Sequence, residues 1–102
     1  MAENEGGGMV GDGFKALSDP TRRRILELLG EHDMTASEIG VHFPQSKATL
    51  SHHLEALREA GLVKAERQGR RVLYQLDTTV LQSLIAWFYS LAESEGNDEL
   101  KT

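Results

Sequence analysis

The sequence predicts an α+β fold that is mainly α-helical and carries one small β-hairpin. Three observations predict it. Apolar residues recur at helical spacing in separate segments between residues 14 and 92, capping residues bound these segments, and one stretch, 71–76, alternates as a strand does. A chain of 102 residues is long enough for one domain with a modest core.

A short helix and a longer helix are expected first, with a break at Ser18-Asp19-Pro20 between them. Asp19 is a natural N-cap, and Pro20 suits the first helical position because its missing N–H needs no partner there. In the arginine run 22–24 we expect solvation of at least two side chains and a phosphate contact by one. The apolar face of the longer helix consists of Ile25, Leu28 and Leu29.

Two short helices joined by a tight turn come next. Thr35 and Glu38 fit a capping box, in which two side chains satisfy two backbone N–H groups at a helix start. The turn at residues 44–45 leads to a second helix over 46–60, which Ser46 caps and Gly61 ends. This arrangement is a helix-turn-helix, whose second helix would enter a DNA major groove.

A hairpin and a last helix complete the chain. Residues 68–70 form the turn of the hairpin, and Thr78 or Thr79 caps the helix. Trp87 and its apolar neighbours make this helix apolar nearly all round, so we expect a second copy of the chain to cover one side. The element order predicts a winged helix-turn-helix with a terminal dimerisation helix. A coiled-coil-like seam on the last helix consists of Leu81, Leu84, Phe88 and Leu91.

Composition excludes several classes of site. The chain has no cysteine, so it has no disulfide, thiolate ligand or thiol nucleophile. The N-terminus lacks a signal-peptide pattern, and no apolar run approaches the roughly 18 residues of a membrane span, so we expect a cytoplasmic protein without a membrane partner. We expect a flexible tail over residues 1–12, the winged domain over 13–92 and a flexible acidic tail over 93–102.

The net charge of −5 conceals a basic centre. Between residues 44 and 71 six basic residues stand against three acidic ones, which gives a local charge of +3. A locally basic surface suits a polyanionic partner such as double-stranded DNA.

Four segments, in this order and at these spacings, resemble the ArsR/SmtB family of bacterial transcription regulators. They are FKALSDPTRRRILELL (14–29), TASEIG (35–40), SKATLSHHLEALREAGLV (46–63) and RQGRRVLYQL (67–76). The resemblance implies a homodimeric regulator, most often a repressor, that binds an operator and dimerises through its first and last helices. Metal-sensing relatives carry cysteines, or Asp, His and Glu ligands on the last helix. Residues 79–92 contain none of these, so we expect no metal site and no cofactor.

The expected DNA contacts lie on the second helix of the helix-turn-helix and on the wing. The first turns of such a helix meet base edges, and a wing arginine reaches the flanking minor groove or the backbone of an imperfect inverted repeat. The residues concerned are Gln45, Ser46, Lys47, Thr49, Ser51, His52, Arg67, Arg70 and Arg71.

The expected dimer interface is apolar and aromatic. At helical spacing, aromatic residues favour packing over a ligand-binding role. The residues concerned are Phe14, Leu17, Leu81, Leu84, Trp87, Phe88 and Leu91.

The adjacent histidines have different expected roles. His52 and His53 point about 100° apart on a helix, so they do not easily chelate one ion together. We expect His52 to face DNA and His53 to be a packed, hydrogen-bonded residue at the helix edge. Ser51 beside His52 does not indicate catalysis, because neighbouring side chains on a helix diverge and no third orienting group is evident, so we expect no enzyme.

Two alternatives stay open. A metal-responsive regulator would need a non-standard site built from His32 and His42, or from the acidic residues of the 93–99 segment. A protein-interaction adaptor would use the winged fold as a docking surface, in keeping with the net negative charge. A separate sensor or co-regulator protein is a further expected partner of the regulator.

Overall fold

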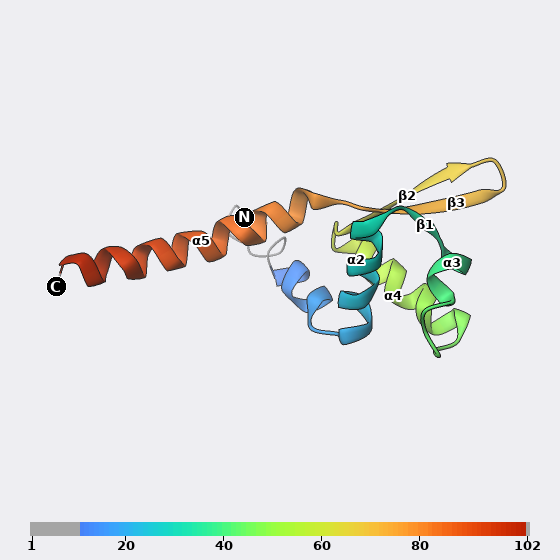
Figure 1. Cartoon of the computed structure of the whole chain (residues 1–102), viewed down its shortest axis with the longest axis horizontal. Helices are drawn as coiled ribbons and strands as arrows, with labels where there is room; N and C mark the ends of the chain where they lie inside the picture. Colours follow the sequence, from blue (N-terminus) through green and yellow to red (C-terminus); the bar gives the residue numbers. More distant parts are fainter. Residues whose placement is uncertain (1–10, 102) are drawn as a thin grey trace.

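The computed structural model describes the backbone of residues 11–101 and the side chains of residues 11–94. Of the tail expected over residues 1–12, only the last two residues fall within this part, and they belong to a helical segment over 11–17. The mainly helical fold with a small sheet is confirmed. The further elements in Figure 1 are α2 (Pro20–Glu31), β1 (Met34–Thr35), α3 (Ala36–Gly40), α4 (Lys47–Glu59), β2 (Val63–Gln68), β3 (Arg71–Leu76) and α5 (Thr78–Lys101).

The helix starts are built as the sequence predicts. Asp19 caps α2 and accepts hydrogen bonds from two backbone N–H groups, with Pro20 at the first helical position. Thr35 and Glu38 form a complete capping box at α3. The hydroxyl of Ser46 caps α4 by accepting from the Thr49 N–H at 3.2 Å. Each cap satisfies donors that the helix cannot pair internally, so these side chains fix where the helices begin.

The end of α4 is fixed by Gly61, which has a φ of +79°. The Leu62 N–H bonds the Leu57 carbonyl and the Gly61 N–H bonds the Arg58 carbonyl, the two bonds of a Schellman motif. A Cβ atom on Gly61 would lie 2.9 Å from Cγ2 of Val80 at the start of α5. Gly61 is therefore required both by its backbone conformation and by the close approach of α5.

The sheet has three antiparallel strands in the order β1-β3-β2. β2 and β3 form the expected hairpin, with Gly69 at a φ of +64° in its turn. The sequence analysis did not predict β1, which pairs Met34 with Tyr74 and Thr35 with Leu73. Two residues are too few for an alternating pattern, so only the pairing with β3 defines this strand.

The core consists of apolar side chains contributed by the first helix, by α2, α3, α4 and the start of α5, and by residues of β1 and at the start of β2. Ile25 of α2, Ile39 of α3, and Leu57 and Leu62 around the end of α4 are fully buried. Their burial holds α4 against the rest of the domain, because apolar area removed from water stabilises the fold by roughly 25 cal/mol per Å².

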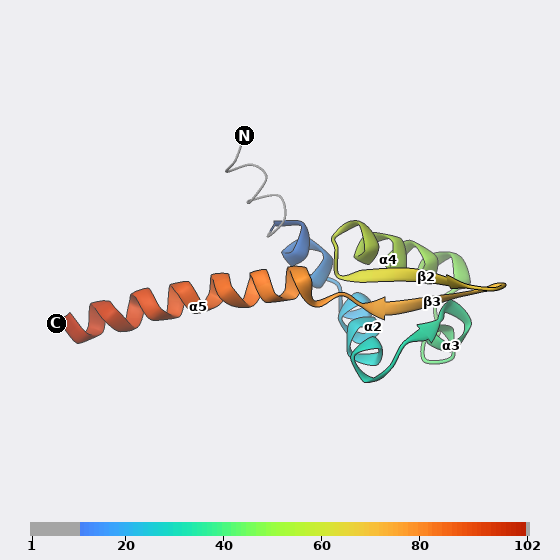
Figure 2. The ribbon, with the colours of Figure 1, turned by 90° about the horizontal axis from the view of Figure 1, so that it is seen from above.

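Helix α5 projects away from the body, as Figures 1 and 2 show from two directions. Its start is packed through Val80 and Leu84, whereas every side chain described from Ile85 onward is exposed. Asp77 accepts the Thr79 N–H at 3.0 Å, so the cap is Asp77 and not Thr78 or Thr79. The helix was expected to end near residue 92 but continues to Lys101, and it accounts for the long dimension of the 58 × 30 × 21 Å molecule.

Candidate nucleic-acid interface

Helix α4 has a buried side and an exposed side. Leu50, Leu54 and Leu57 are buried against the domain. The expected contact residues Ser46, Lys47, Thr49, Ser51 and His52 are all exposed. Ser46 and Thr49 also bond each other through their hydroxyl groups at 3.0 Å. The start of α4 therefore presents hydroxyl, ammonium and imidazole groups to solvent, which are groups that can bond base edges or phosphates.

A groove of about 530 Å³ lies beside this surface, between α3 and α4. Lys47 and Ser51 lie along it together with Ser37 and Val41, and 84% of Val41 is exposed. Lys47 has no ion-pair partner among the residues whose side chains the structure describes. Its ammonium group is therefore available to an anionic partner.

Gln45 differs from the other expected contact residues. Its Nε2 atom donates to the hydroxyl oxygen of Thr21 in α2 at 2.8 Å. Its Oε1 atom is buried and has no hydrogen-bond partner in the described part of the chain. To contact a base, as is expected from the sequence, the side chain would have to leave Thr21.

His52 and His53 separate as expected, with ring centroids 6.2 Å apart and planes inclined by 58°. His52 is exposed and lies beside a hollow of about 330 Å³ that Lys15 and Arg22 also line. His53 is half-buried, but its Nδ1 atom is buried without a partner among the described residues. The expected hydrogen bond of His53 is therefore not found at this nitrogen.

Asp19 lies close enough to His53 for the two charges to interact. Burial raises the pKa of Asp19, but the N–H groups of Arg22 and Thr21, with the positive charges of His53 and Arg22, outweigh it and lower the pKa below the ordinary value of 3.8. The carboxylate of Asp19 therefore stays ionised at neutral pH.

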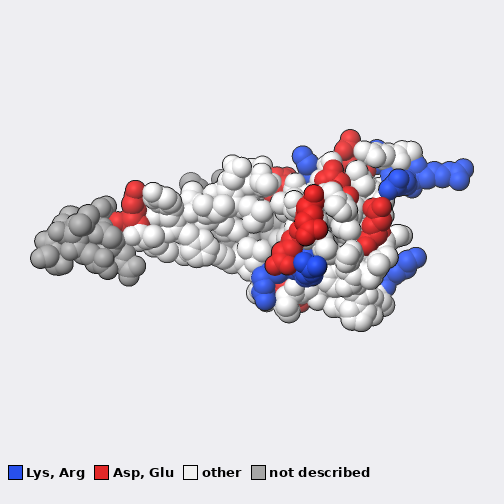
Figure 3. All heavy atoms as spheres, in the orientation of Figure 1, with Lys and Arg blue, Asp and Glu red and all other residues white. Residues whose placement is uncertain are grey.

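The wing is the hairpin of β2 and β3. Arg67 and Arg70 are exposed and have no polar side-chain partner within the described residues. Figure 3 shows basic side chains at the far end of this hairpin and acidic side chains over the middle of the same face. The tip can therefore approach a polyanion, while the acidic part of this face would be repelled by one.

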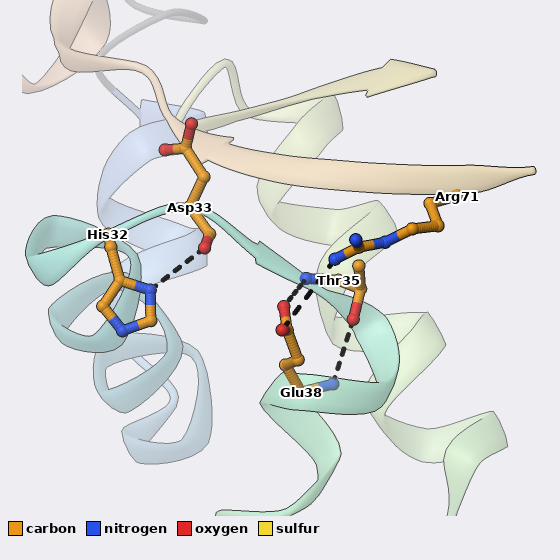
Figure 4. Close-up of polar contacts among 5 residues, drawn as sticks. All are labelled: His32, Asp33, Thr35, Glu38 and Arg71. Atoms are coloured by element: carbon orange, nitrogen blue, oxygen red, sulfur yellow. Dashed lines mark hydrogen bonds and ion pairs between the residues drawn. The ribbon is translucent and has the colours of Figure 1, made fainter. Parts of the chain in front are cut away.

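Arg71 lies at the start of β3, beside the wing turn, and contacts the body of the domain. Its Nη2 atom lies 3.9 Å from Oε2 of Glu38, as Figure 4 shows. The backbone N–H of Thr35 lowers the pKa of Glu38 first of all, burial raises it, and the Thr35 hydroxyl and the charges of Arg71 and His32 lower it further. Glu38 thus serves both as a partner in the capping box and as the partner of a wing arginine.

The arginine run on α2 has a structural role that the sequence analysis did not predict. Arg22 donates to the carbonyls of Ala16 at 2.8 Å and Lys15 at 3.2 Å, and Arg23 donates to the carbonyl of Leu17 at 2.8 Å. These carbonyls end the helix over 11–17 and have no partner within that helix. Arg24 pairs with Glu27 at 3.1 Å. Two of the three arginines therefore hold the first helix against α2.

The expected dimer residues form an apolar face on the first helix and α5. Phe14 packs edge-on against Trp87 and Phe88, with ring centroids 5.3 and 5.5 Å apart. Leu84 is buried within the chain itself, and Leu17 and Leu81 are partly buried against the core. Most of the apolar area left uncovered lies on Ile85, Trp87, Phe88, Tyr89 and Leu91, with 42–64% of each residue exposed.

Comparisons with known proteins agree with this architecture. Residues 19–65 match the model of the family described as "Bacterial regulatory protein, arsR family". The transcriptional repressor SdpR of Bacillus subtilis is 48% identical over 85 residues, which cover 83% of this chain and 94% of SdpR. The chain belongs to the ArsR family. As the sequence analysis expects, ArsR-family proteins are transcriptional regulators and not enzymes.

Two solved structures support the assignment to the ArsR family. An ArsR-like transcriptional regulator from Rhodococcus sp. RHA1 superposes with a TM-score of 0.77 at 32% identity, covering 91% of this chain and 87% of that protein. A homodimeric winged helix-turn-helix DNA-binding domain from Mycobacterium bovis superposes with a TM-score of 0.67 at 30% identity, covering 90% of this chain and 82% of that one.

The part of the chain that the structure describes holds neither a metal-binding cluster nor a membrane-spanning helix. Among the residues that the structure describes, no group of three or more His, Cys, Asp and Glu side chains is placed to hold a metal ion. In the same part of the chain, none of the helices is long and apolar enough to cross a membrane.

Proposed function

We propose that this ArsR-family chain is a homodimeric repressor that binds an imperfect inverted repeat in double-stranded DNA. One observation carries the proposal. The exposed start of α4 and the arginines of the wing lie toward one end of the molecule, whereas the uncovered apolar face of α5 extends toward the other (Figure 1). A chain built in this way can contact DNA and a second copy at the same time.

DNA binding is assigned to two parts of the chain. The helix over 46–60 enters the major groove, where Lys47, Ser51 and His52 face base edges or phosphates. Arg67 and Arg70 of the wing reach the flanking minor groove or backbone. A two-fold dimer presents two such helices, so the half-sites lie about one helical turn, ~34 Å, apart. A bacterial operator lies in the cytoplasm, and we place the protein there.

Dimerisation is assigned to Phe14 and the exposed residues of α5. Its support is the cluster of aromatic rings that remains half open to water in one chain, together with the homodimeric state of the Mycobacterium bovis relative. Repression is inferred from SdpR, whose name describes a transcriptional repressor. The signal that ends repression would come from a separate sensor or co-regulator protein.

The test is a fluorescence-anisotropy titration of the protein against the DNA upstream of its own gene, at two salt concentrations, with and without Zn(II) or Ni(II). We expect tight binding that weakens steeply with salt and is indifferent to either metal. Binding that changes with metal would revive the metal-responsive alternative. Failure to bind this DNA or random duplex would contradict the proposal and favour the adaptor.

Arg70→Ala tests the wing separately. The variant should weaken binding to all duplexes similarly and reduce the slope of log K against log salt by about 0.9 for each phosphate that the wing no longer neutralises. Arg58→Ala is the matched control, because Arg58 lies in the last turn of α4, away from the wing, and is paired with Glu55. An unchanged affinity and slope for Arg70→Ala would show that the wing does not touch DNA.

A further inference from the structure

One hydrogen bond joins the turn before α4 to the first turn of α2. The Gln45 amide donates from Nε2 to Thr21 Oγ1 at 2.8 Å, across 24 positions of sequence, and the contact is partly buried. Thr21 is itself fixed, because its backbone N–H donates to the Asp19 carboxylate at 2.8 Å. Gln45 is thus tied to a rigid, capped helix start.

Because Gln45 lies just before α4, this hydrogen bond restrains the start of α4. Gln45 directly precedes Ser46, which caps α4, so fixing its side chain also fixes the point where α4 begins. The buried side chains of α4 are Leu50, Leu54 and Leu57, which hold it against the domain by apolar packing. Apolar packing is non-directional and tolerates small rotations, whereas a hydrogen bond of 2.8 Å has a preferred direction and length.

The second polar atom of the amide, its oxygen, is shielded from solvent. Gln45 Oε1 is buried and has no partner among the described residues, so it is shielded from solvent and is not exposed toward a ligand. Turning the side chain outward to a base would break the bond to Thr21 and leave that half-buried hydroxyl without its donor.

We propose that Gln45 is a positioning residue of DNA recognition and does not read a base. Through Thr21 it sets the place and angle at which α4 presents Lys47, Ser51 and His52 to the major groove. This inference rests on the proposed function as a DNA-binding regulator. It separates Gln45 from the exposed residues of α4 that the sequence analysis grouped with it.

The test begins with selection of preferred sequences from a randomised duplex library by the full-length wild-type chain. Base preference at each position and affinity are then measured for Gln45→Met, Thr21→Val and the double variant. Both substitutions keep side-chain size and remove the hydrogen bond. We expect each single variant to bind the selected duplex about tenfold more weakly, with the same base preferences as wild type, and the double variant to bind no worse than either single variant.

Two further measurements test whether Gln45 positions α4. The slope of log K against log salt should stay unchanged, because the phosphate-contacting side chains are intact. Thr21→Ser keeps the hydroxyl group and should restore affinity to within about twofold of wild type. Thermal unfolding of each variant checks the fold, and the Thr21→Ser rescue keeps the test decisive if Thr21→Val proves unstable.

Three outcomes would overturn the inference. Loss of preference at one base position in Gln45→Met, with Thr21→Val like wild type, would make Gln45 a base reader. Additive losses in the double variant would mean that the two side chains act separately. A wild-type chain that selects no sequence would remove the proposed function itself, and this outcome is distinct because it is seen before any variant is made.

Discussion

At the scale of single residues, Asp19 shows how a charge contributes to the fold. Its carboxylate caps α2, and its pKa is lower in the folded chain than the ordinary 3.8. Stability from this carboxylate is therefore fully present above pH 3.8 and is lost as the pH falls through the folded pKa. Asp19→Ala should lower the free energy of unfolding by about 1 kcal/mol at neutral pH.

Urea unfolding between about pH 2.5 and 7 measures this effect. Asp19→Asn is the control, because asparagine caps a helix without a titrating group. The difference in stability between wild type and Asp19→Asn should shrink as the pH falls below 3.8. A difference that is constant over the whole range would show that the charge of Asp19 contributes nothing.

Glu38 offers a second prediction at the same scale. Its ion pair with Arg71 is long, 3.9 Å, and largely exposed, so it contributes little stability but competes with a phosphate for Arg71. Glu38→Gln should raise affinity for DNA about two- to threefold at low salt, and the capping box should survive because glutamine also forms it. Anisotropy titrations measure the change.

Glu93→Gln is the control for this change in charge, because it removes the same charge from α5. An equal gain of affinity in both variants would mean that only the net charge matters, and no gain in Glu38→Gln would mean that Arg71 does not reach DNA.

A single-residue feature could be predicted from the sequence only where the residues that cause it are close together in the sequence. The caps at Asp19, Thr35 and Ser46 were predictable, because cap and helix are adjacent in sequence. The bond between Gln45 and Thr21 joins residues 24 positions apart, and no pattern marks it in advance. For the same reason the arginine run 22–24 was assigned to solvent and phosphate, although two of its members hold the first helix.

At the scale of elements, Gly61 and Gly69 both have a positive φ but differ in their surroundings. A Cβ on Gly61 would meet Val80 at 2.9 Å, whereas a Cβ on Gly69 in the wing turn would meet nothing within 4 Å. Gly69→Ala should therefore cost only the backbone strain, roughly 1 kcal/mol. Gly61→Ala should lower the free energy of unfolding by clearly more, because a steric clash is added.

Chemical denaturation of both variants measures the two costs. Equal losses would show that Val80 moves aside freely, so that the junction between α4 and α5 is loosely packed. We expect Gly61→Ala to destabilise the end of α4 more than Gly69→Ala does, since Gly61 forms the C-terminal Schellman motif of α4.

A helix or strand could be predicted from the sequence where its apolar pattern extends over enough residues to be recognised. The spacing of Leu50, Leu54 and Leu57 identifies α4 and its buried side. Strand β1 has two residues and exists only through pairing with β3, so its cause is tertiary. The end of α5 was misplaced because the apolar seam stops near residue 91, whereas the helix continues through polar residues to Lys101.

At the scale of the whole molecule, we expect the uncovered face of α5 to form the dimer interface. Phe88→Glu places a charge among aromatic rings that the proposed dimer buries, while 55% of Phe88 is exposed in the single chain. The variant should therefore fold but sediment as a monomer. It should also bind an inverted repeat at least about a hundredfold more weakly, since only one α4 helix then contacts the DNA.

Analytical ultracentrifugation and anisotropy measure both effects. Gln82→Glu is the control, because it adds the same charge at an exposed position on α5. A Phe88→Glu protein that remains dimeric would place the dimer interface elsewhere.

Val80 gives the assembly a further property. It lies against Gly61 after the end of α4 and against Gly13 of the first helix. A Cβ atom added to Gly13 would lie 3.3 Å from Cγ1 of Val80. In the proposed dimer, Val80 of each chain would therefore help to set the distance between the two α4 helices. We expect a change in the size of this side chain to alter the half-site spacing that the protein prefers, although Val80 contacts no nucleotide.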